Sequence, residues 1–141
     1  MGHSFILFVS VIMKKLLLIG IAGLFLTACA GITQEQIKNA DYGQYPSNYK
    51  DIVKGYYDSI AKDPDSLKFK EIAEPKKAWL NDFGTHKFGY MSCVTVNGKN
   101  SYGAYVGYKT DGILIKNGTV IHFIDNVAQY NRMWNGNFCK K

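Results

Sequence analysis

Histidines are the first residues to examine for catalysis, because their ordinary pKa suits proton transfer near neutral pH. The sequence has three, of which His86 and His122 lie in the body of the chain. We expect His86 in a solvated loop. His122 alternates with Val120 and Ile124 along an expected strand, on the face that should be buried. We therefore interpret His122 as a hydrogen-bonded core residue, and two separated histidines give no zinc-type spacing.

Other arrangements that support metal binding or catalysis are incomplete. Four carboxylates occupy places 1, 3, 9 and 12 of a calcium-loop register: Asp63, Asp65, Glu71 and Glu74. Places 5 and 6 are Leu67 and Lys68, where a calcium loop needs an oxygen ligand and a glycine. The chain also lacks the Gly-x-Ser-x-Gly, phosphate-loop and His-Glu-x-x-His patterns. We therefore expect no metal, no cofactor and no enzymatic activity.

The start of the chain has the layout of an export signal. Lys14 and Lys15 precede an uncharged apolar run of 13 residues, Leu16–Ala28. That run is shorter than the ~20 residues that span a bilayer, as in a signal peptide. It ends in Leu26-Thr27-Ala28-Cys29, which resembles the lipobox of bacterial lipoproteins. The resemblance implies cleavage before Cys29 and a lipid anchor, including palmitate, on that cysteine.

Residues on both sides of this signal refine the expectation. Residues 1–12 stand upstream of a complete signal, so we expect the natural start at Met13. A single anchor over residues 5–28 would place two lysines inside the membrane, at a cost of ~2.5 kcal/mol or more each. By the same resemblance, Ala30 in place of Asp favours the periplasmic face of the outer membrane, in a bacterium with two membranes. We therefore expect residues 1–28 to be an upstream extension and signal peptide.

Composition limits the class of protein to which the chain can belong. Of 141 residues, 17 are Lys or Arg and 11 are Asp or Glu, a formal net charge of +6. Without Lys14 and Lys15 the balance is 15 against 11, or +4. A hydrophobic content of 47% excludes a disordered chain, and 14% aromatic residues favour a β-rich body. A mildly basic exported domain favours anionic surfaces, and we expect no nucleic-acid partner there.

Polar composition with weak periodicity predicts a tether over residues 29–45, which the lipobox resemblance implies is lipidated, and clear periodicity predicts a single α+β domain over residues 46–141. Within the tether, a short helical turn is expected over residues 33–39. Ser47 is a natural N-cap, and apolar residues at helical spacing predict an amphipathic helix over residues 48–62. A period of two then predicts strands over residues 67–72, 88–96, 101–109, 113–116 and 119–125. The expected fold is one N-terminal helix packed on a four- or five-stranded antiparallel meander sheet.

Two cysteines remain once Cys29 is assigned to lipid. A pair of cysteines in an exported domain most often forms a disulfide, so we expect Cys93 to bond to Cys139. Their separation of 46 residues would give about 4 kcal/mol of stability by the chain-entropy model. The bond would fasten an irregular tail, Asn126–Lys141, onto the second strand. A redox or nucleophilic cysteine is the alternative, although the chain has no Cys-x-x-Cys.

The segment between the second and third expected strands combines tyrosines with glycines. If residues 101–109 form a strand, one face carries Tyr102, Ala104, Val106 and Tyr108, which we expect in the core. The other face places Tyr105 between Gly103 and Gly107. That bare strip of backbone predicts either close packing of the helix or tail against the glycines, or a recognition groove. The candidate binding strip is Tyr102, Gly103, Tyr105, Gly107 and Tyr108.

Short motifs of the expected domain are similar to those of small uncharacterised bacterial envelope lipoproteins. Asp41-Tyr42-Gly43 and Tyr45-Pro46 precede the helix, Asp63-Pro64-Asp65-Ser66 follows it, and Asn100-Ser101-Tyr102-Gly103 lies in an expected strand. The resemblance implies a shared fold and no particular activity.

We therefore expect a lipid-anchored, non-enzymatic envelope lipoprotein that binds an envelope protein or an anionic cell-wall or lipid component. A phage- or plasmid-borne exclusion lipoprotein is an alternative that the sequence does not separate from it. The enzymatic alternative is a small envelope hydrolase that uses His122 with Asp125 or another carboxylate. Residues three apart on one strand point to opposite faces, so Asp125 is poorly placed for that role.

Overall fold

The computed structural model describes residues 31–134 and 137–140, and at residues 133 and 134 the backbone alone. The expected signal and Cys29 lie outside the described residues. The chain divides into two compact units, residues 1–39 and residues 40–141. Among the residues that the structure describes, no helix is long and apolar enough to cross a membrane.

Helix α2, Gln34–Asn39, is the described part of the first unit and matches the predicted helical turn. Thr33 and Gln36 form a capping box at its start. The Gln36 backbone N–H donates to Thr33 Oγ1 (3.2 Å), and the Thr33 N–H donates to Gln36 Oε1 (2.8 Å). Each bond satisfies a donor that the helix start would otherwise leave free, so this short helix is specified locally.

Helix α3, Tyr49–Ile60, opens the second unit and corresponds to the helix predicted over residues 48–62. Its apolar face buries Val53 and Tyr57 completely or nearly so. The short 3-10 turn η1, Pro64–Ser66, follows, since Pro64 supplies no N–H to continue a helix. Because α2 precedes it, α3 is not the single N-terminal helix that was predicted.

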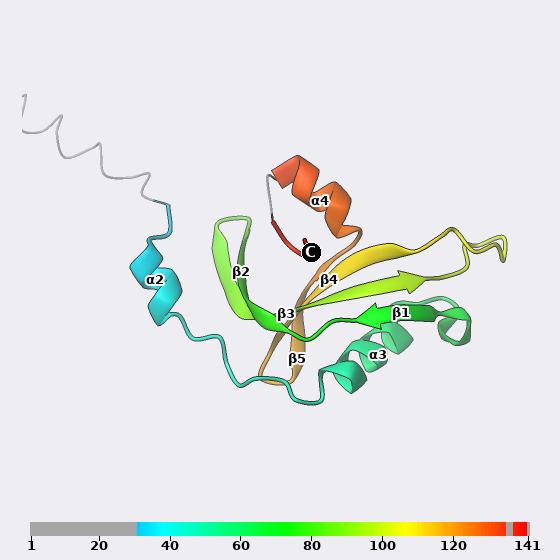
Figure 1. Ribbon diagram of the computed structural model, residues 1–141, viewed down its shortest axis with the longest axis horizontal. Coiled ribbons are helices and arrows are strands. Elements are labelled where there is room, and N and C mark those ends of the chain that lie inside the picture. Colours follow the sequence, from blue (N-terminus) through cyan, green and yellow to red (C-terminus); the bar gives the residue numbers. More distant parts are fainter. Residues whose placement is uncertain (1–30, 135–136, 141) are drawn as a thin grey trace, which may run out of the picture. The chain divides into compact units, whose positions relative to one another are not determined.

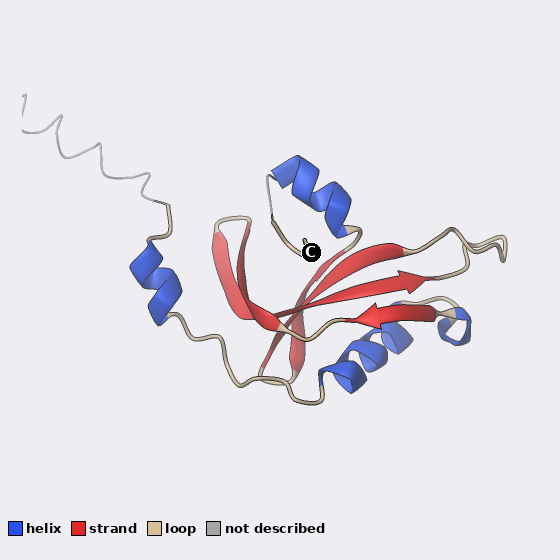
Figure 2. Ribbon diagram, viewed as in Figure 1, coloured by secondary structure: helices blue, strands red, loops and turns tan. Residues whose placement is uncertain are grey.

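Five strands form one antiparallel sheet, as shown in Figure 2. They are β1 (Lys68–Ile72), β2 (Lys76–Asp82), β3 (Thr85–Asn97), β4 (Lys109–Lys116) and β5 (Thr119–Ile124). The long strand β3 pairs with β4 along one edge, and with β2 and then β1 along the other. The fold is therefore α+β, with the outer edge of β3 covered by two short strands in place of one.

The two faces of this sheet carry separate apolar clusters. One cluster packs α3 against the sheet and contains Val53, Tyr57, Val94, Val96, Ile113 and Ile115. The other contains Leu80, Met91, Leu114, Ile124 and Val127, with Phe138 and Cys139 packed against it. Helix α4, Val127–Trp134, lies on this second face, opposite α3 in Figure 1. The sheet therefore has a cover on each side, where a single helix was predicted.

Three sequence predictions about the second half of the chain are wrong. Residues 101–108 are not a strand: they form an exposed loop, and β4 begins only at Lys109. The tail expected to be irregular contains α4. Strand β2 was not predicted. Its Asn81 pairs with His86 of β3, so His86 lies in a strand and not in the expected loop. His86 is exposed, as expected.

Candidate functional site

The tyrosine loop, residues 98–108, connects β3 to β4 and protrudes from the end of the sheet (Figure 1). Two asparagine side chains shape it. Asn100 Oδ1 accepts hydrogen bonds from the backbone N–H groups of Tyr102 (2.9 Å) and Ala104 (3.1 Å). Asn97 Oδ1 accepts one from the Gly107 N–H (3.1 Å). Together with backbone bonds such as that from the Asn100 N–H to the Ala104 carbonyl oxygen (2.9 Å), these side chains give the loop a defined turn geometry.

The two glycines of the predicted strip serve this backbone geometry. Gly103 has φ +80° and Gly107 has φ +100°. Residues with a Cβ atom rarely adopt these backbone angles. A Cβ built on either residue would meet nothing within 4 Å. The prediction that a helix or tail packs closely against these glycines is therefore wrong.

The aromatic side chains of the loop face solvent. Tyr102 is 95% exposed, Val106 66% and Tyr108 53%. These residues were predicted to share a core face with Ala104, which is also exposed. The error follows from the loop: its two sides are joined by an isolated bridge between Lys99 and Tyr105, and the loop projects beyond the sheet, so neither of its faces is covered. Three large exposed side chains within seven residues mark this loop as a candidate contact surface.

Lysines surround the tyrosines of this loop. The Lys68 ammonium lies 4.1 Å from the centroid of the Tyr105 ring, and the Lys99 ammonium lies 5.6 Å from it. Lys70 lies 5.8 Å from the Tyr108 ring. All three lysines are exposed, so their ammonium groups can also meet an anion.

Two hydrogen bonds dock the loop onto the segment that follows α3. The Tyr105 hydroxyl donates to the Ser66 carbonyl oxygen (3.0 Å), and Lys62 Nζ donates to Ser101 Oγ (3.3 Å). Tyr105 is the least exposed tyrosine of the loop, at 39%. Tyr105 therefore holds the loop in place, and Tyr102 and Tyr108 are free to contact a partner.

A second candidate site lies on the sheet face that carries α4. It is a groove of about 1270 Å³ between β2 and the C-terminal segment. Its lining includes Ala78, Leu80, Met91, Tyr130 and Phe138, with His122 and Asp82 also present. About half of the lining residues are polar or charged, so the groove combines an apolar floor with groups that could orient a polar ligand. Sequence reasoning missed this groove because it did not predict β2.

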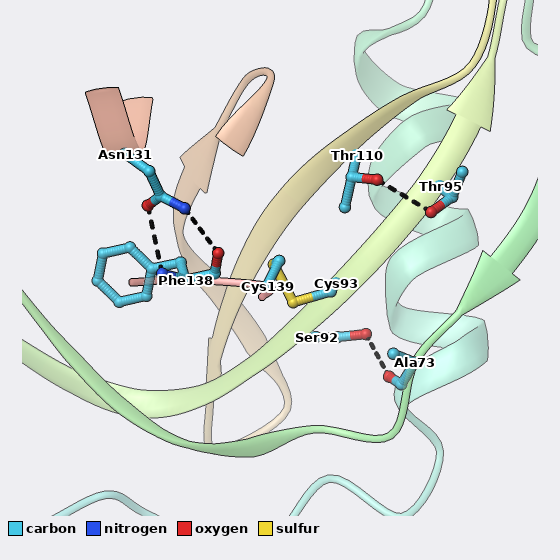
Figure 3. Close-up of a disulfide and its surroundings, with 8 residues drawn as sticks. All are labelled: Ala73, Ser92, Cys93, Thr95, Thr110, Asn131, Phe138 and Cys139. Carbon is cyan, nitrogen blue, oxygen red and sulfur yellow. Dashed lines mark hydrogen bonds between the residues drawn. A yellow bond between two sulfur atoms is a disulfide. The ribbon is translucent and has the colours of Figure 1, made fainter. Parts of the chain in front are cut away.

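The predicted disulfide between Cys93 and Cys139 is confirmed, and it forms part of this groove. Figure 3 shows it beside a second fastening of the same segment. Asn131 of α4 donates through Nδ2 to the Phe138 carbonyl oxygen (2.8 Å), and its Oδ1 accepts from the Phe138 N–H (3.2 Å). The C-terminal segment is therefore fixed to β3 covalently and to α4 by hydrogen bonds.

A polar cluster lies at the β2–β3 hairpin end of the groove. Lys87 Nζ lies 2.6 Å from Asp82 Oδ2, and His122 Nδ1 lies 3.6 Å from the same oxygen. The hydrogen bond from Lys87 lowers the pKa of Asp82, which is therefore ionised at neutral pH. Burial lowers the pKa of His122 below its usual value of 6.5, so its imidazole is neutral at pH 7.

His122 is only partly buried, and it does not share a face with Val120 as predicted. The pairing of β4 with β5 shifts between Leu114 and Ile115: Leu114 faces His122, but Ile115 faces Val120. This bulge adds Ile121 to β5 and reverses the alternation of side chains. Val120 therefore packs on the α3 face, and His122 lies with Ile124 on the groove face.

The predicted partner of His122, Asp125, is engaged elsewhere. Asp125 and the fully buried Asp111 both form ion pairs with Lys109. Asp111 also accepts hydrogen bonds from the Tyr57 hydroxyl (2.7 Å) and the Asn126 N–H (2.9 Å). Burial, followed by this hydrogen bond, raises the pKa of Tyr57 far above its usual value. This network joins α3 to the sheet, and we assign it a structural role.

No cluster of three or more histidine, cysteine or carboxylate side chains that could hold a metal ion occurs in the part of the chain that the structure describes. In comparisons with known proteins, no family model, curated protein or solved structure matches this chain.

Proposed function

We propose that this protein is a lipid-anchored lipoprotein of the bacterial cell envelope with a non-enzymatic binding role. The resemblance of Leu26-Thr27-Ala28-Cys29 to a lipobox supports the anchor on Cys29, with the outer membrane's periplasmic face favoured in a two-membrane organism. The Cys93–Cys139 disulfide is consistent with an exported, oxidising location.

The tyrosine loop is the binding surface in this proposal, and its exposure is the observation that carries it. Tyr102 is 95% exposed at the tip of a loop whose shape is set by Asn97 and Asn100. A rigid loop that holds out a tyrosine gains contact area at a low entropic cost. The lysines around it favour an envelope protein or an anionic cell-wall or lipid component, in preference to nucleic acid, as the partner.

Crosslinking in intact envelopes tests the binding role. We expect a partner to be captured by the native protein and lost with Tyr102→Ala, a change that spares the fold because the Tyr102 side chain is almost fully exposed. Phe83→Ala is the matched control, since Phe83 is fully exposed at the β2–β3 hairpin. Capture that is equal for all three proteins would contradict the role given to the loop.

Mass spectrometry of the mature N-terminus tests the anchor independently. We expect the native protein to begin at a lipid-modified Cys29. An unmodified protein that begins at Met1 or Met13 would show that the lipoprotein proposal is wrong, whatever the crosslinking result.

A small hydrolase remains a second candidate, because the structure places Asp82 beside His122. A neutral imidazole whose Nδ1 faces a carboxylate has its Nε2 available as a general base. Hydrolysis of ester and amide substrates by the purified protein, abolished by His122→Gln and by Asp82→Asn, would favour this candidate. Activity that persists in both variants would exclude this site.

A further inference from the structure

We propose that the tyrosine loop docks on anionic lipid headgroups of the same bilayer that holds the lipid on Cys29. This inference rests on the proposed lipid anchor and names the partner of the loop. The docking would make the loop a second membrane contact, which orients the domain once the lipid has attached it.

The apolar side chains of the loop favour a bilayer over a soluble polymer. Tyr102, Val106 and Tyr108 are exposed within seven residues of one another. Tyrosine prefers the membrane–water interface, where its ring meets the acyl boundary and its hydroxyl stays hydrated. An acidic polymer could bind the lysines and contact the tyrosine rings, but it offers no apolar layer in which Val106 could be buried.

The charge around the loop favours anionic headgroups. Four lysines contact the loop or belong to it, and all four are exposed: Lys62, Lys68, Lys70 and Lys99. Two carboxylates at η1, Asp63 and Asp65, lie near these lysines in the chain and reduce the local excess of positive charge. Each surface lysine near an anionic leaflet contributes about fivefold in binding, and salt screens it.

The position of the loop explains why it would orient the domain. Tyr42, near the start of the second unit, packs against Phe88 of β3, with ring centroids 5.6 Å apart. The loop leaves β3 at Asn97, nine residues further along, which corresponds to about 30 Å of strand. The chain therefore enters the domain near one end of β3 and the loop lies beyond the other end, so docking of the loop would add a second attachment far from the first.

Oxidation of the protein on vesicles tests whether the loop docks on anionic headgroups. The mature protein is reconstituted in vesicles of phosphatidylcholine alone, or of phosphatidylcholine with phosphatidylglycerol, and is oxidised briefly by hydroxyl radicals. The tryptic peptide of residues 100–109 contains all three loop tyrosines and reports their accessibility. We expect most of its oxidation to be lost on anionic vesicles at low salt, and to recover at high salt. Equal oxidation on both vesicles would overturn the proposal.

Matched variants separate the loop from general electrostatics. We expect Lys68→Gln and Lys70→Gln each to reduce the protection, and Tyr102→Ala to reduce it even at low salt. Lys54→Gln removes an exposed lysine from α3, and Phe83→Ala removes an exposed ring from the other hairpin. Loss of protection in these two controls would also overturn the proposal.

Two further arms identify other outcomes. Soluble polyphosphate added to neutral vesicles tests whether any polyanion protects the loop. Protection equal to that on phosphatidylglycerol would show that the partner is an acidic polymer and not the bilayer. If Cys29 carries no lipid, the anchor is wrong. The isolated protein added to the same vesicles then shows whether the loop itself recognises anionic lipid.

Discussion

The two faces of the sheet are closed by different physical means. The α3 face is closed by packing, with Val53, Val94, Ile113 and Ile115 inaccessible to solvent or nearly so. The opposite face is closed by a helix of eight residues and by a segment held through a disulfide. A groove of about 1270 Å³ remains there. Where apolar contact is incomplete, a covalent bond supplies the missing constraint.

The largest effect expected from this difference is on removal of the disulfide. The double variant Cys93→Ala, Cys139→Ala should lower the free energy of unfolding by about 4 kcal/mol, because a 46-residue loop is released in the unfolded chain. Hydrogen exchange should show α4 losing protection before α3. Equal loss in both helices would mean that the two faces do not differ in this way.

Truncation of one apolar side chain on each face comes next. Ile113→Ala should cost about 3–4 kcal/mol, because Ile113 is fully buried between the sheet and α3. Leu80→Ala, beside the groove, should cost about 2 kcal/mol, because its surroundings are open on one side. Chemical denaturation measures both values. The reverse order would show that the groove face is the better packed one.

Removal of a hydrogen bond to the buried carboxylate should have a smaller effect. Tyr57→Phe leaves Asp111 without its hydroxyl donor, which should cost about 1.5–3 kcal/mol, since the acceptor is charged and buried. Tyr130→Phe on the groove face retains its ring contact with Phe138 and is the control. A cost below that of the control would indicate that water replaces the lost donor.

The smallest expected effect is a pH dependence on the groove face. Because burial lowers the pKa of His122, the unfolded chain takes up the proton first as the pH falls. The contribution of His122 to stability is therefore complete above about pH 6.5 and is lost as the pH drops through its folded pKa. Denaturation at several pH values should show this loss in the native protein and not in His122→Gln. Loss that persists in the variant would assign it to another group.

Local sequence signals predicted the elements that local interactions specify. The helical spacing around Val53 and Tyr57 predicted α3, the Asn117-Gly118 pair predicted the β4–β5 hairpin, and the paired cysteines predicted the disulfide. In each case the physical cause lies in a few adjacent residues, or in the chemistry of a single pair.

Sequence reasoning failed where pairing partners decide the structure. Alternating tyrosines and glycines suggested a strand, but the side chains of Asn97 and Asn100 accept three of the backbone N–H groups of that segment, and it bends into a loop. The bulge at Ile121 reversed the faces of β5, so that His122 reached the groove. Asp82 and Lys87 could have been paired in advance, since a turn at Phe83-Gly84 places them on one face, but this required recognising β2.

The outer edge of β3 is paired with two short strands, β1 and β2, and this arrangement affects whether copies of the protein can associate through strand pairing. Residues 73–75, between β1 and β2, interrupt the strand pairing along this edge of β3. The Ala73 N–H still donates a hydrogen bond to the Cys93 carbonyl oxygen, but the buried Pro75 has no N–H to donate. Four lysines occupy the two short strands: Lys68, Lys70, Lys76 and Lys77. An uninterrupted, uncharged edge of this length would be a template for intermolecular β-pairing. The interruption and its charges therefore protect the protein against edge-to-edge aggregation, most of all where it is concentrated on a surface.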